Sequence, residues 1–252
     1  MKTVIFLYGL LIGSFLNVCI YRIPREESIV FPSSHCFSCG TNLKWYDLVP
    51  VLSYMVQKGK CRYCGEKFSS QYPIIELFNG VLYLLIYIKF DFTLEFFFYC
   101  ILFSILMVVA LIDLKHMIIP DVLILCIFIL SILYKIAAYV LWMEPFNIVQ
   151  SIGGLILSGL FFVLIIFLSK GGMGEGDVTL ISSLGFILGI KDIFLTIFLS
   201  FVVGAIISVF LLITKIKGRK DPIPFGPFII FSFFMVVFWG NQLVQWYLNN
   251  FY

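Results

Sequence analysis

The chain has 252 residues, of which 62% are hydrophobic and only 12% are charged, and its mean hydropathy is +1.08. A soluble domain of this length cannot remove so much apolar surface from water, so the composition excludes an ordinary soluble globular protein. The formal net charge of +3 is too small to indicate binding to nucleic acid. Long apolar runs instead predict an all-α polytopic membrane protein.

Eight apolar segments are candidates for transmembrane helices, which need roughly 17–25 residues to cross a bilayer. They cover 3–21, 73–89, 94–112, 121–142, 146–169, 178–190, 192–214 and 224–248. The first has hardly any basic n-region and no small-residue cleavage pattern, so it is interpreted as a spanning helix and not as a cleavable signal. The sixth is short, and we expect it either to borrow residues from the loop before it or to form a tilted half-helix.

The positions of the basic residues predict the orientation of these spans. If the loop 22–72 lies in the cytoplasm, thirteen of the 17 Lys and Arg residues fall in cytoplasmic loops. Only Lys2, Lys89 and Lys191 fall on the opposite side, and Lys135 lies within a span. Because cytoplasmic loops carry the excess of Lys and Arg, both termini are expected outside and the long loop inside. The thirteen residues are Arg22, Arg25, Lys44, Lys58, Lys60, Arg62, Lys67, Lys115, Lys170, Lys215, Lys217, Arg219 and Lys220.

The long polar loop, 22–72, contains two Cys-x-x-Cys pairs. Cys36 and Cys39 form the first pair, and Cys61 and Cys64 form the second after twenty-one intervening residues. In a reducing cytoplasm structural disulfides are not expected, and this spacing is typical of a four-cysteine zinc site. Four thiolates complete a tetrahedral shell, so the predicted role of the zinc is structural. The alternatives are metal-free reduced thiols or a redox pair.

Two aspartates lie beside apolar segments, where a carboxylate without a partner is costly. Asp113 ends the third span, and Asp177 closes the glycine-rich stretch 171–177 just before the sixth. Two neighbouring carboxylates share a proton, so one can activate water while the other polarises a peptide carbonyl. The pattern therefore predicts an aspartic protease. The alternative for each aspartate is an interfacial residue that is solvated or caps a helix, as Asp121 after Pro120 is expected to do.

Six motifs follow one another along nearly the whole chain, and together they resemble a known family. They are Gly13-Ser14-Phe15-Leu16-Asn17-Val18 with Tyr21-Arg22-Ile23-Pro24, the paired cysteines around Trp45-Tyr46-Asp47 and Leu52-Ser53-Tyr54, Gly59-Lys60-Cys61-Arg62, Tyr72-Pro73-Ile74-Ile75-Glu76-Leu77, Asp113 with Pro120-Asp121, and Gly174-Glu175-Gly176-Asp177. The chain resembles the bacterial type IV prepilin leader peptidases and N-methyltransferases, which are integral membrane aspartic proteases of the Gly-x-Gly-Asp kind.

The resemblance implies a catalytic pair, Asp113 and Asp177, and an active-site loop formed by Gly174, Glu175 and Gly176. It also implies the substrates, which are the precursors of type IV pilins and of the pseudopilins used in protein secretion. Members of this family remove a short basic leader after a glycine, at the cytoplasmic face of the bacterial inner membrane. One departure is Thr179, where the family often has lysine, and it puts a local charge contact in doubt.

A second activity is also implied by the resemblance. Many members methylate the new N-terminal amine with S-adenosylmethionine, and this activity is associated with the cysteine loop. Because that loop is intact here, both activities are expected. Gly59 is a candidate residue for methyl transfer, and Glu76 is a candidate for holding substrate or cofactor or, alternatively, for capping its helix.

The expected organisation is a first transmembrane helix (1–21), a cytoplasmic zinc-binding loop (22–72) and a transmembrane aspartic peptidase core (73–252). Two other classes of function stay open at this point. An ion-coupled transporter also uses intramembrane carboxylates and glycine-broken helices, but it predicts internal repeats, which the sequence lacks. A non-catalytic membrane scaffold with a zinc docking loop leaves both aspartates and the glycine-rich stretch unexplained.

Overall fold

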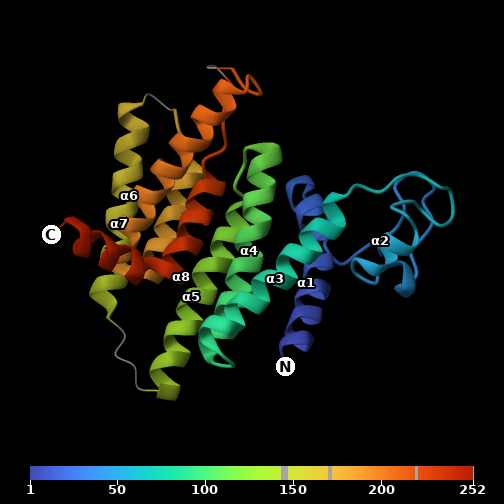
Figure 1. Ribbon diagram of the computed structural model, residues 1–252, viewed down its shortest axis with the longest axis horizontal. Helices are drawn as coiled ribbons and strands as arrows, with labels where there is room; N and C mark the ends of the chain where they lie inside the picture. Colours follow the sequence, from blue (N-terminus) through green and yellow to red (C-terminus); the bar gives the residue numbers. More distant parts are fainter. Residues whose placement is uncertain (143–146, 170–171, 219–220, 252) are drawn as a thin grey trace. The chain divides into compact units, whose positions relative to one another are not determined.

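The computed structural model describes residues 1–142, 147–169, 172–218 and 221–251, and within these ranges its regular structure is helical (Figure 1). The helices are α1 (Lys2–Arg22), α2 (Leu52–Val56), α3 (Gln71–Phe90), α4 (Leu94–His116), α5 (Asp121–Trp142), α6 (Ile148–Leu168), α7 (Glu175–Ile213) and α8 (Gly226–Phe251), with the short 3-10 helices η1 (Ile23–Arg25) and η2 (Trp45–Asp47). The predicted all-α membrane fold is confirmed, because seven helices in the described part are long and apolar enough to cross a membrane.

The difference between eight expected spans and seven observed helices lies in α7. This helix has 39 residues, and if straight it would be about 58 Å long, roughly twice the hydrocarbon thickness of a bilayer. Gly189 interrupts it with φ 77° and ψ −178°, a conformation that other residues rarely adopt. The break coincides with the boundary expected between the sixth and seventh spans. The segment before it is only about 21 Å long, in agreement with the expectation of a short sixth span.

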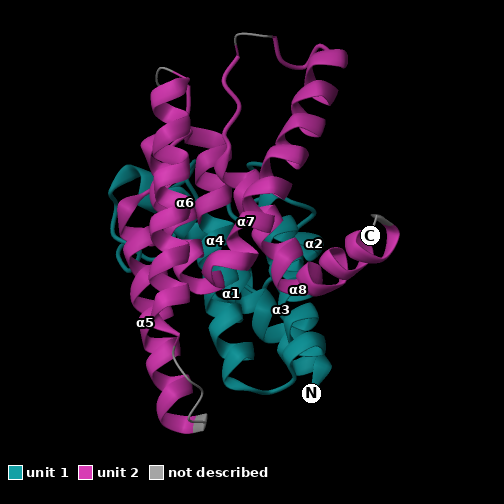
Figure 2. Cartoon of the chain, turned by 90° about the vertical axis from the view of Figure 1, so that its left-hand side faces the viewer, with its two compact units in different colours: residues 1–108 teal, residues 109–252 magenta. Residues whose placement is uncertain are grey.

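The chain forms two compact units, residues 1–108 and residues 109–252 (Figure 2). The first contains α1, α2, α3 and most of α4, and the second contains the end of α4 and the helices from α5 to α8. Each unit has its own apolar core. Fully buried side chains include Ile20, Ile86, Leu102 and Leu106 in the first unit and Phe162, Leu180, Ile181 and Phe233 in the second.

In the first unit α1 and α3 pack side by side with their backbones very close (Figure 1). A Cβ atom built on Gly9 would lie 2.8 Å from the Cα of Gly80, and one built on Gly13 would lie 2.8 Å from the Cα of Glu76. Asn79 Nδ2 donates a hydrogen bond to the Gly9 carbonyl at 2.7 Å. Small residues therefore bring the two helices together, as they do in many membrane proteins.

In the second unit α7 is held on two sides. Gly154 on α6 and Gly185 on α7 face one another with no room for a side chain on either. The hydroxyl of Ser158 donates to the Gly154 carbonyl at 2.7 Å, so a polar group at this interface is satisfied. On the other side Gly204 packs against the ring of Phe228 on α8. This packing orders α7, whose first turn carries the predicted catalytic residue Asp177.

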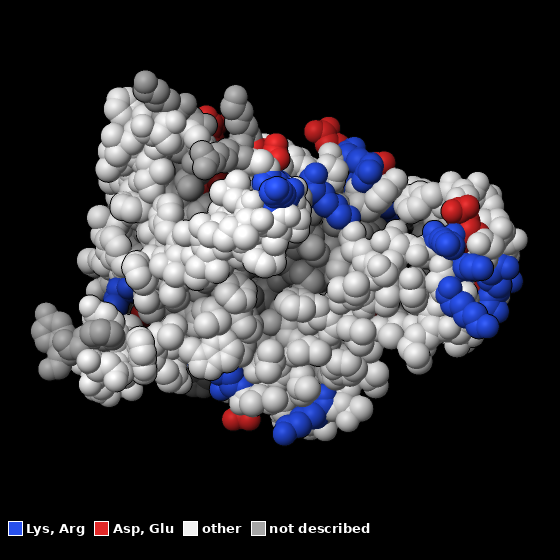
Figure 3. Space-filling view, turned by 45° about the horizontal axis from the view of Figure 1, so that its top comes forward, with Lys and Arg blue, Asp and Glu red and all other residues white. Residues whose placement is uncertain are grey.

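Charged side chains are sparse on the face seen in Figure 3, where Lys and Arg gather on the loop between α1 and α3. Five exposed basic residues of that loop are Lys44, Lys58, Lys60, Arg62 and Lys67. Three other residues of the predicted cytoplasmic set, Lys170, Arg219 and Lys220, lie outside the described residues, as do Gly171 of the glycine-rich stretch and the expected start of a span at 146. The cytoplasmic orientation of the loop stays a prediction.

Candidate active site and metal site

The two predicted catalytic aspartates lie at helix ends in the second unit. Asp113 is in the last turn of α4 and Asp177 is in the first turn of α7, and their exposed fractions are only 5% and 7%. The backbone N–H of Asp177 donates to the carbonyl of Gly174, the N-cap of α7, at 3.2 Å. The two carboxylates are close enough to interact directly through their charges.

The start of α8 completes this site. The backbone N–H of Gly226 donates to Asp113 Oδ2 at 3.1 Å, and a Cβ at Gly226 would lie only 2.6 Å from the same oxygen. Ile119 packs beneath both glycines of the site, 2.9 Å from the Cβ position of Gly176 and 3.3 Å from that of Gly226. The ends of α4, α7 and α8 therefore converge on the two aspartates.

Asp177 carries the unsatisfied atom of this site. Its Oδ1 is buried and has no hydrogen-bond partner among the described residues. A buried polar atom without a partner is costly, so this oxygen needs a proton, a water molecule or a substrate group. A buried carboxyl pair with one free oxygen can activate a water molecule and polarise a carbonyl.

The other residues of the expected active-site loop lie at the surface. Gly174 and Glu175 are exposed, and Gly176 is half-buried. Thr179, which stands where the resemblance implies lysine, is exposed and donates its hydroxyl hydrogen to the Gly176 carbonyl at 3.0 Å. Asp121 is the exposed first residue of α5, and its position agrees with a stabilising role at a helix start.

Sequence reasoning did not identify Gly226. A Gly-Pro pair before an apolar run indicates a helix start, because proline is favoured in the first turn. That local signal contains no information about Asp113, which is 113 residues away.

The four cysteines of the long loop come together in the first unit. Their sulfur atoms all lie within 4.8 Å of one another, and the Sγ atoms of Cys36 and Cys64 are 3.8 Å apart. Tetrahedral zinc with Zn–S bonds of about 2.3 Å requires S–S separations of roughly 3.8 Å. The donor set therefore fits zinc. The Thr41 hydroxyl, 3.3 Å from Cys39 Sγ, can donate a hydrogen bond to the thiolate, and this contact lowers the pKa of the Cys39 thiol to about 6, which favours the form that a metal binds.

The two Cys-x-x-Cys segments form equivalent turns. Gly40 N–H donates to the Cys36 carbonyl at 2.8 Å, and Gly65 N–H donates to the Cys61 carbonyl at 2.9 Å. Both glycines have positive φ angles, 69° and 78°, as expected for the chain reversal of a zinc knuckle. A matching β-bridge encloses each turn, one between residues 35 and 42 and one between residues 60 and 67. The local sequence pattern therefore shapes both halves of the site in the same way.

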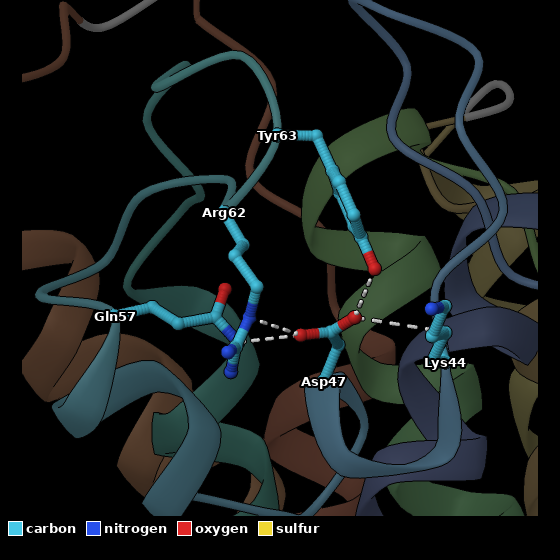
Figure 4. A network of polar contacts seen from close by, with 5 residues as sticks. All are labelled: Lys44, Asp47, Gln57, Arg62 and Tyr63. Carbon is cyan, nitrogen blue, oxygen red and sulfur yellow. Dashed lines mark hydrogen bonds and ion pairs between the residues drawn. The ribbon is translucent and has the colours of Figure 1, made fainter.

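Asp47 joins the two halves of the loop (Figure 4). Its Oδ1 accepts hydrogen bonds from Arg62 Nε at 2.9 Å and Gln57 Nε2 at 3.2 Å. Its Oδ2 accepts from the Tyr63 hydroxyl at 3.0 Å and the backbone N–H of Lys44 at 3.2 Å. Arg62 and Tyr63 are the two residues between the second pair of cysteines, so this carboxylate fixes the second knuckle to the segment that follows the first.

The two candidate residues for methyl transfer also lie in the first unit. Glu76 is buried in the second turn of α3, and its Oε2 accepts a hydrogen bond from the backbone N–H of Val51 at 2.7 Å. It therefore holds the loop and does not cap its own helix. Gly59 is buried in the turn after α2 with φ 68°, and a Cβ there would lie 2.9 Å from the ring of Tyr54.

Two family models match the chain. The model of the bacterial peptidase A24 N-terminal domain matches residues 7–90, and that of the type IV leader peptidase family matches residues 100–209. The four cysteines lie within the first match, and both Asp113 and Asp177 lie within the second.

Curated proteins named prepilin leader peptidase/N-methyltransferase are similar over nearly the whole chain. The protein of Bacillus subtilis (strain 168) is 32% identical, with 99% of this chain and 98% of the relative covered. Those of Xanthomonas campestris pv. campestris and Pseudomonas aeruginosa are 33% and 31% identical, each with 96% of this chain and 92% of the relative covered. No solved structure matches the chain.

Proposed function

The chain belongs to the type IV leader peptidase family, and we propose that it is a membrane aspartic endopeptidase that removes the short basic leader from type IV prepilins or pseudopilins, cutting after glycine. We further propose that it then methylates the new N-terminal amine. The observation that carries the proposal is the buried pair Asp113 and Asp177, which three helix ends bring together. The transporter and scaffold alternatives have no counterpart among the three relatives described above.

The surroundings of the two aspartates support different roles for them. Asp113 Oδ2 accepts the Gly226 N–H, which favours the ionised form of this carboxyl, and we assign to it the role of general base toward a water molecule. Asp177 Oδ1 has no hydrogen-bond partner among the described residues, and we assign the shared proton to this carboxyl, which then polarises the peptide carbonyl. Water adds to the carbonyl carbon, the C–N bond then breaks, and the leaving amine takes a proton from the pair.

The position of the pair suits a substrate that is half in the membrane. A prepilin presents a basic leader in the cytosol and an apolar helix in the bilayer, so its scissile bond lies at the membrane face. Asp113 and Asp177 lie at the ends of apolar helices, and the predicted orientation puts both ends at the cytoplasmic face of the bacterial inner membrane. Gly174 and Gly176 leave the backbone open next to the aspartates.

We propose that the cysteine loop is held by zinc bound to Cys36, Cys39, Cys61 and Cys64, and that methyl transfer depends on this part of the chain. The metal would order a loop that has few apolar residues of its own, and a shell of four thiolates leaves it no catalytic position. S-adenosylmethionine supplies an electrophilic methyl group. The amine nitrogen forms the new N–C bond as the S–C bond breaks, and the amine then releases one proton to solvent.

Mass spectrometry of a synthetic prepilin, incubated with the purified full-length protein in detergent, tests both activities. We expect loss of the leader after glycine, and the addition of a methyl group only when S-adenosylmethionine is present. Asp113→Asn and Asp177→Asn should each abolish cleavage while the protein still inserts into the membrane. Cleavage at the wild-type rate by either variant would overturn the assignment of the catalytic pair.

A further inference from the structure

The first unit contains a cavity of about 150 Å³ among α1, α3 and the loop that joins them. This volume is far larger than a single water molecule needs. Aromatic side chains, including Tyr54 and Tyr72, form part of its wall, together with the buried polar residues Asn17, Arg22 and Glu76. All of these residues belong to the unit that carries the cysteine loop.

Arg22 and Glu76, two oppositely charged side chains of the cavity wall, do not pair with each other, whereas a third charged side chain of the wall, Asp47, pairs with Arg62. Arg22 is 8% exposed, and within the described part of the chain its guanidinium donates to the carbonyls of Ser28 at 2.9 Å and Pro32 at 2.7 Å and to no carboxylate. Glu76 is 6% exposed, and no Lys or Arg among the described residues forms an ion pair with it. Buried charges are costly unless they are compensated, so both groups favour a ligand of opposite charge.

Asn17 provides a second and independent indication of a ligand. This residue is 5% exposed, and its Nδ2 donates to the carbonyls of Gly13 at 3.3 Å and Tyr72 at 3.2 Å. Its Oδ1 is buried without any hydrogen-bond partner among the described residues. Because Asn17 lines the cavity, a ligand that donates a hydrogen bond there would satisfy this atom.

We infer that this cavity binds the methyl donor S-adenosylmethionine, which has a zwitterionic amino-acid group, a sulfonium cation and an aromatic base. The inference rests on the proposed methyl-transfer activity and deepens it by assigning the binding site. Glu76 and Arg22 complement the ammonium and carboxylate of the amino-acid group. Aromatic rings attract cations and stack on bases, and Asn17 Oδ1 accepts from an amine. The N-terminus of a cleaved pilin offers an ammonium group but no free carboxylate, so it would leave Arg22 without a partner.

The position of Gly59 connects it to this cavity. Its carbonyl accepts a hydrogen bond from the Phe68 N–H at 2.8 Å, and both Phe68 and Tyr54 line the cavity. A side chain at Gly59 would press on the ring of Tyr54 and move this wall. The candidate for methyl transfer that the resemblance implies is thus a positioning residue for the cavity.

Binding of S-adenosylmethionine to the full-length protein in detergent, measured by isothermal titration calorimetry, tests the site. Glu76→Gln keeps an oxygen that can accept the Val51 N–H but removes the negative charge. The Kd of this variant for S-adenosylmethionine should therefore rise roughly tenfold or more. Glu27→Gln makes the same change at an exposed position outside the cavity and should leave the Kd unchanged. Cleavage of prepilin by the Glu27→Gln control should equal that of the wild type.

Ultraviolet cross-linking with methyl-labelled S-adenosylmethionine, followed by peptide mapping, gives a second test that does not depend on how a variant folds. Label on peptides that contain Tyr54 or Tyr72 supports the site, and label confined to residues 109–252 overturns it. If the wild-type protein methylates prepilin but Glu76→Gln leaves the Kd for S-adenosylmethionine unchanged, the site is overturned. The proposed methyl-transfer activity would still stand. A wild-type protein that cleaves but neither binds the donor nor methylates overturns both the site and the methyl-transfer proposal.

Discussion

At the scale of single residues, the two aspartates depend on a glycine from a distant part of the chain. The Gly226 N–H holds Asp113 Oδ2, and the missing Cβ of Gly226 leaves the space in which that oxygen lies. A carboxylate that acts on water must be placed to within a fraction of an ångström. Gly226 is therefore a positioning residue. Replacement by alanine, which adds a single methyl group, tests this role.

We expect Gly226→Ala to lower the rate of prepilin cleavage by roughly 100-fold, because a methyl group 2.6 Å from Asp113 Oδ2 must displace the carboxylate. Cleavage kinetics in detergent measure the effect. Gly218→Ala, in the segment before α8, meets no atom closer than 3.4 Å and is the matched control. If Gly226→Ala cleaves as fast as this control, the contact with Asp113 has no role in positioning.

At the scale of helices and loops, the features predicted best from the sequence are those with local causes. The length of each apolar run predicts a membrane span. The spacing of the cysteines predicts the two knuckles, since each turn closes within six residues. Asp113 and Asp177 are recognisable because a carboxylate beside an apolar segment is costly without a partner and therefore indicates a functional role. The contact of Gly226 with Asp113 and the network around Asp47 join distant residues, so no local pattern reveals them. The expected sixth and seventh spans correspond to the two parts of α7, which the non-helical conformation of Gly189 separates.

The break in α7 should require glycine for conformational reasons alone. A Cβ at Gly189 would meet nothing closer than 3.5 Å, but φ 77° with ψ −178° is a region that only glycine occupies readily. We expect Gly189→Ala to destabilise the protein by about 1–3 kcal/mol, measured as a lower midpoint of thermal unfolding in detergent. An unchanged midpoint would show that α7 can continue through this position without strain.

The network around Asp47 makes a prediction for the metal site. Asp47→Asn removes the charge that pairs with Arg62 and places an amide among four donors, which loosens the second knuckle. Residues that orient metal ligands typically change affinity by about 10–100-fold when they are replaced. We expect a loss of that size in zinc affinity, measured by competition with a chelator. Asp91→Asn, at an exposed turn, is the control, and equal affinities for the two variants would contradict the role of Asp47.

At the scale of the whole molecule, the chemistry divides between the two compact units. The cysteine cluster, Glu76 and the proposed donor cavity belong to residues 1–108, and both aspartates with Gly226 belong to residues 109–252. The Gly226 N–H that donates to Asp113 and the Gly174 carbonyl that accepts from the backbone of Asp177 both belong to the second unit. The peptidase site therefore requires no ligand atom of the metal site for its own geometry.

This division predicts that removal of the metal separates the two activities. A chelator strong enough to strip the four thiolates should unfold the knuckles, because such loops take their folding free energy from the metal. Methylation of a prepilin that has already been cleaved should then disappear, whereas cleavage of intact prepilin should continue at a rate within about twofold of the untreated protein, since the geometry of Asp113 and Asp177 is held within the second unit. Mass spectrometry of both products before and after chelation, and again after zinc is restored, measures the effect. Parallel loss of the two activities would mean that the cysteine loop also binds the prepilin for cleavage, and recovery of methylation with zinc distinguishes loss of the metal from irreversible damage.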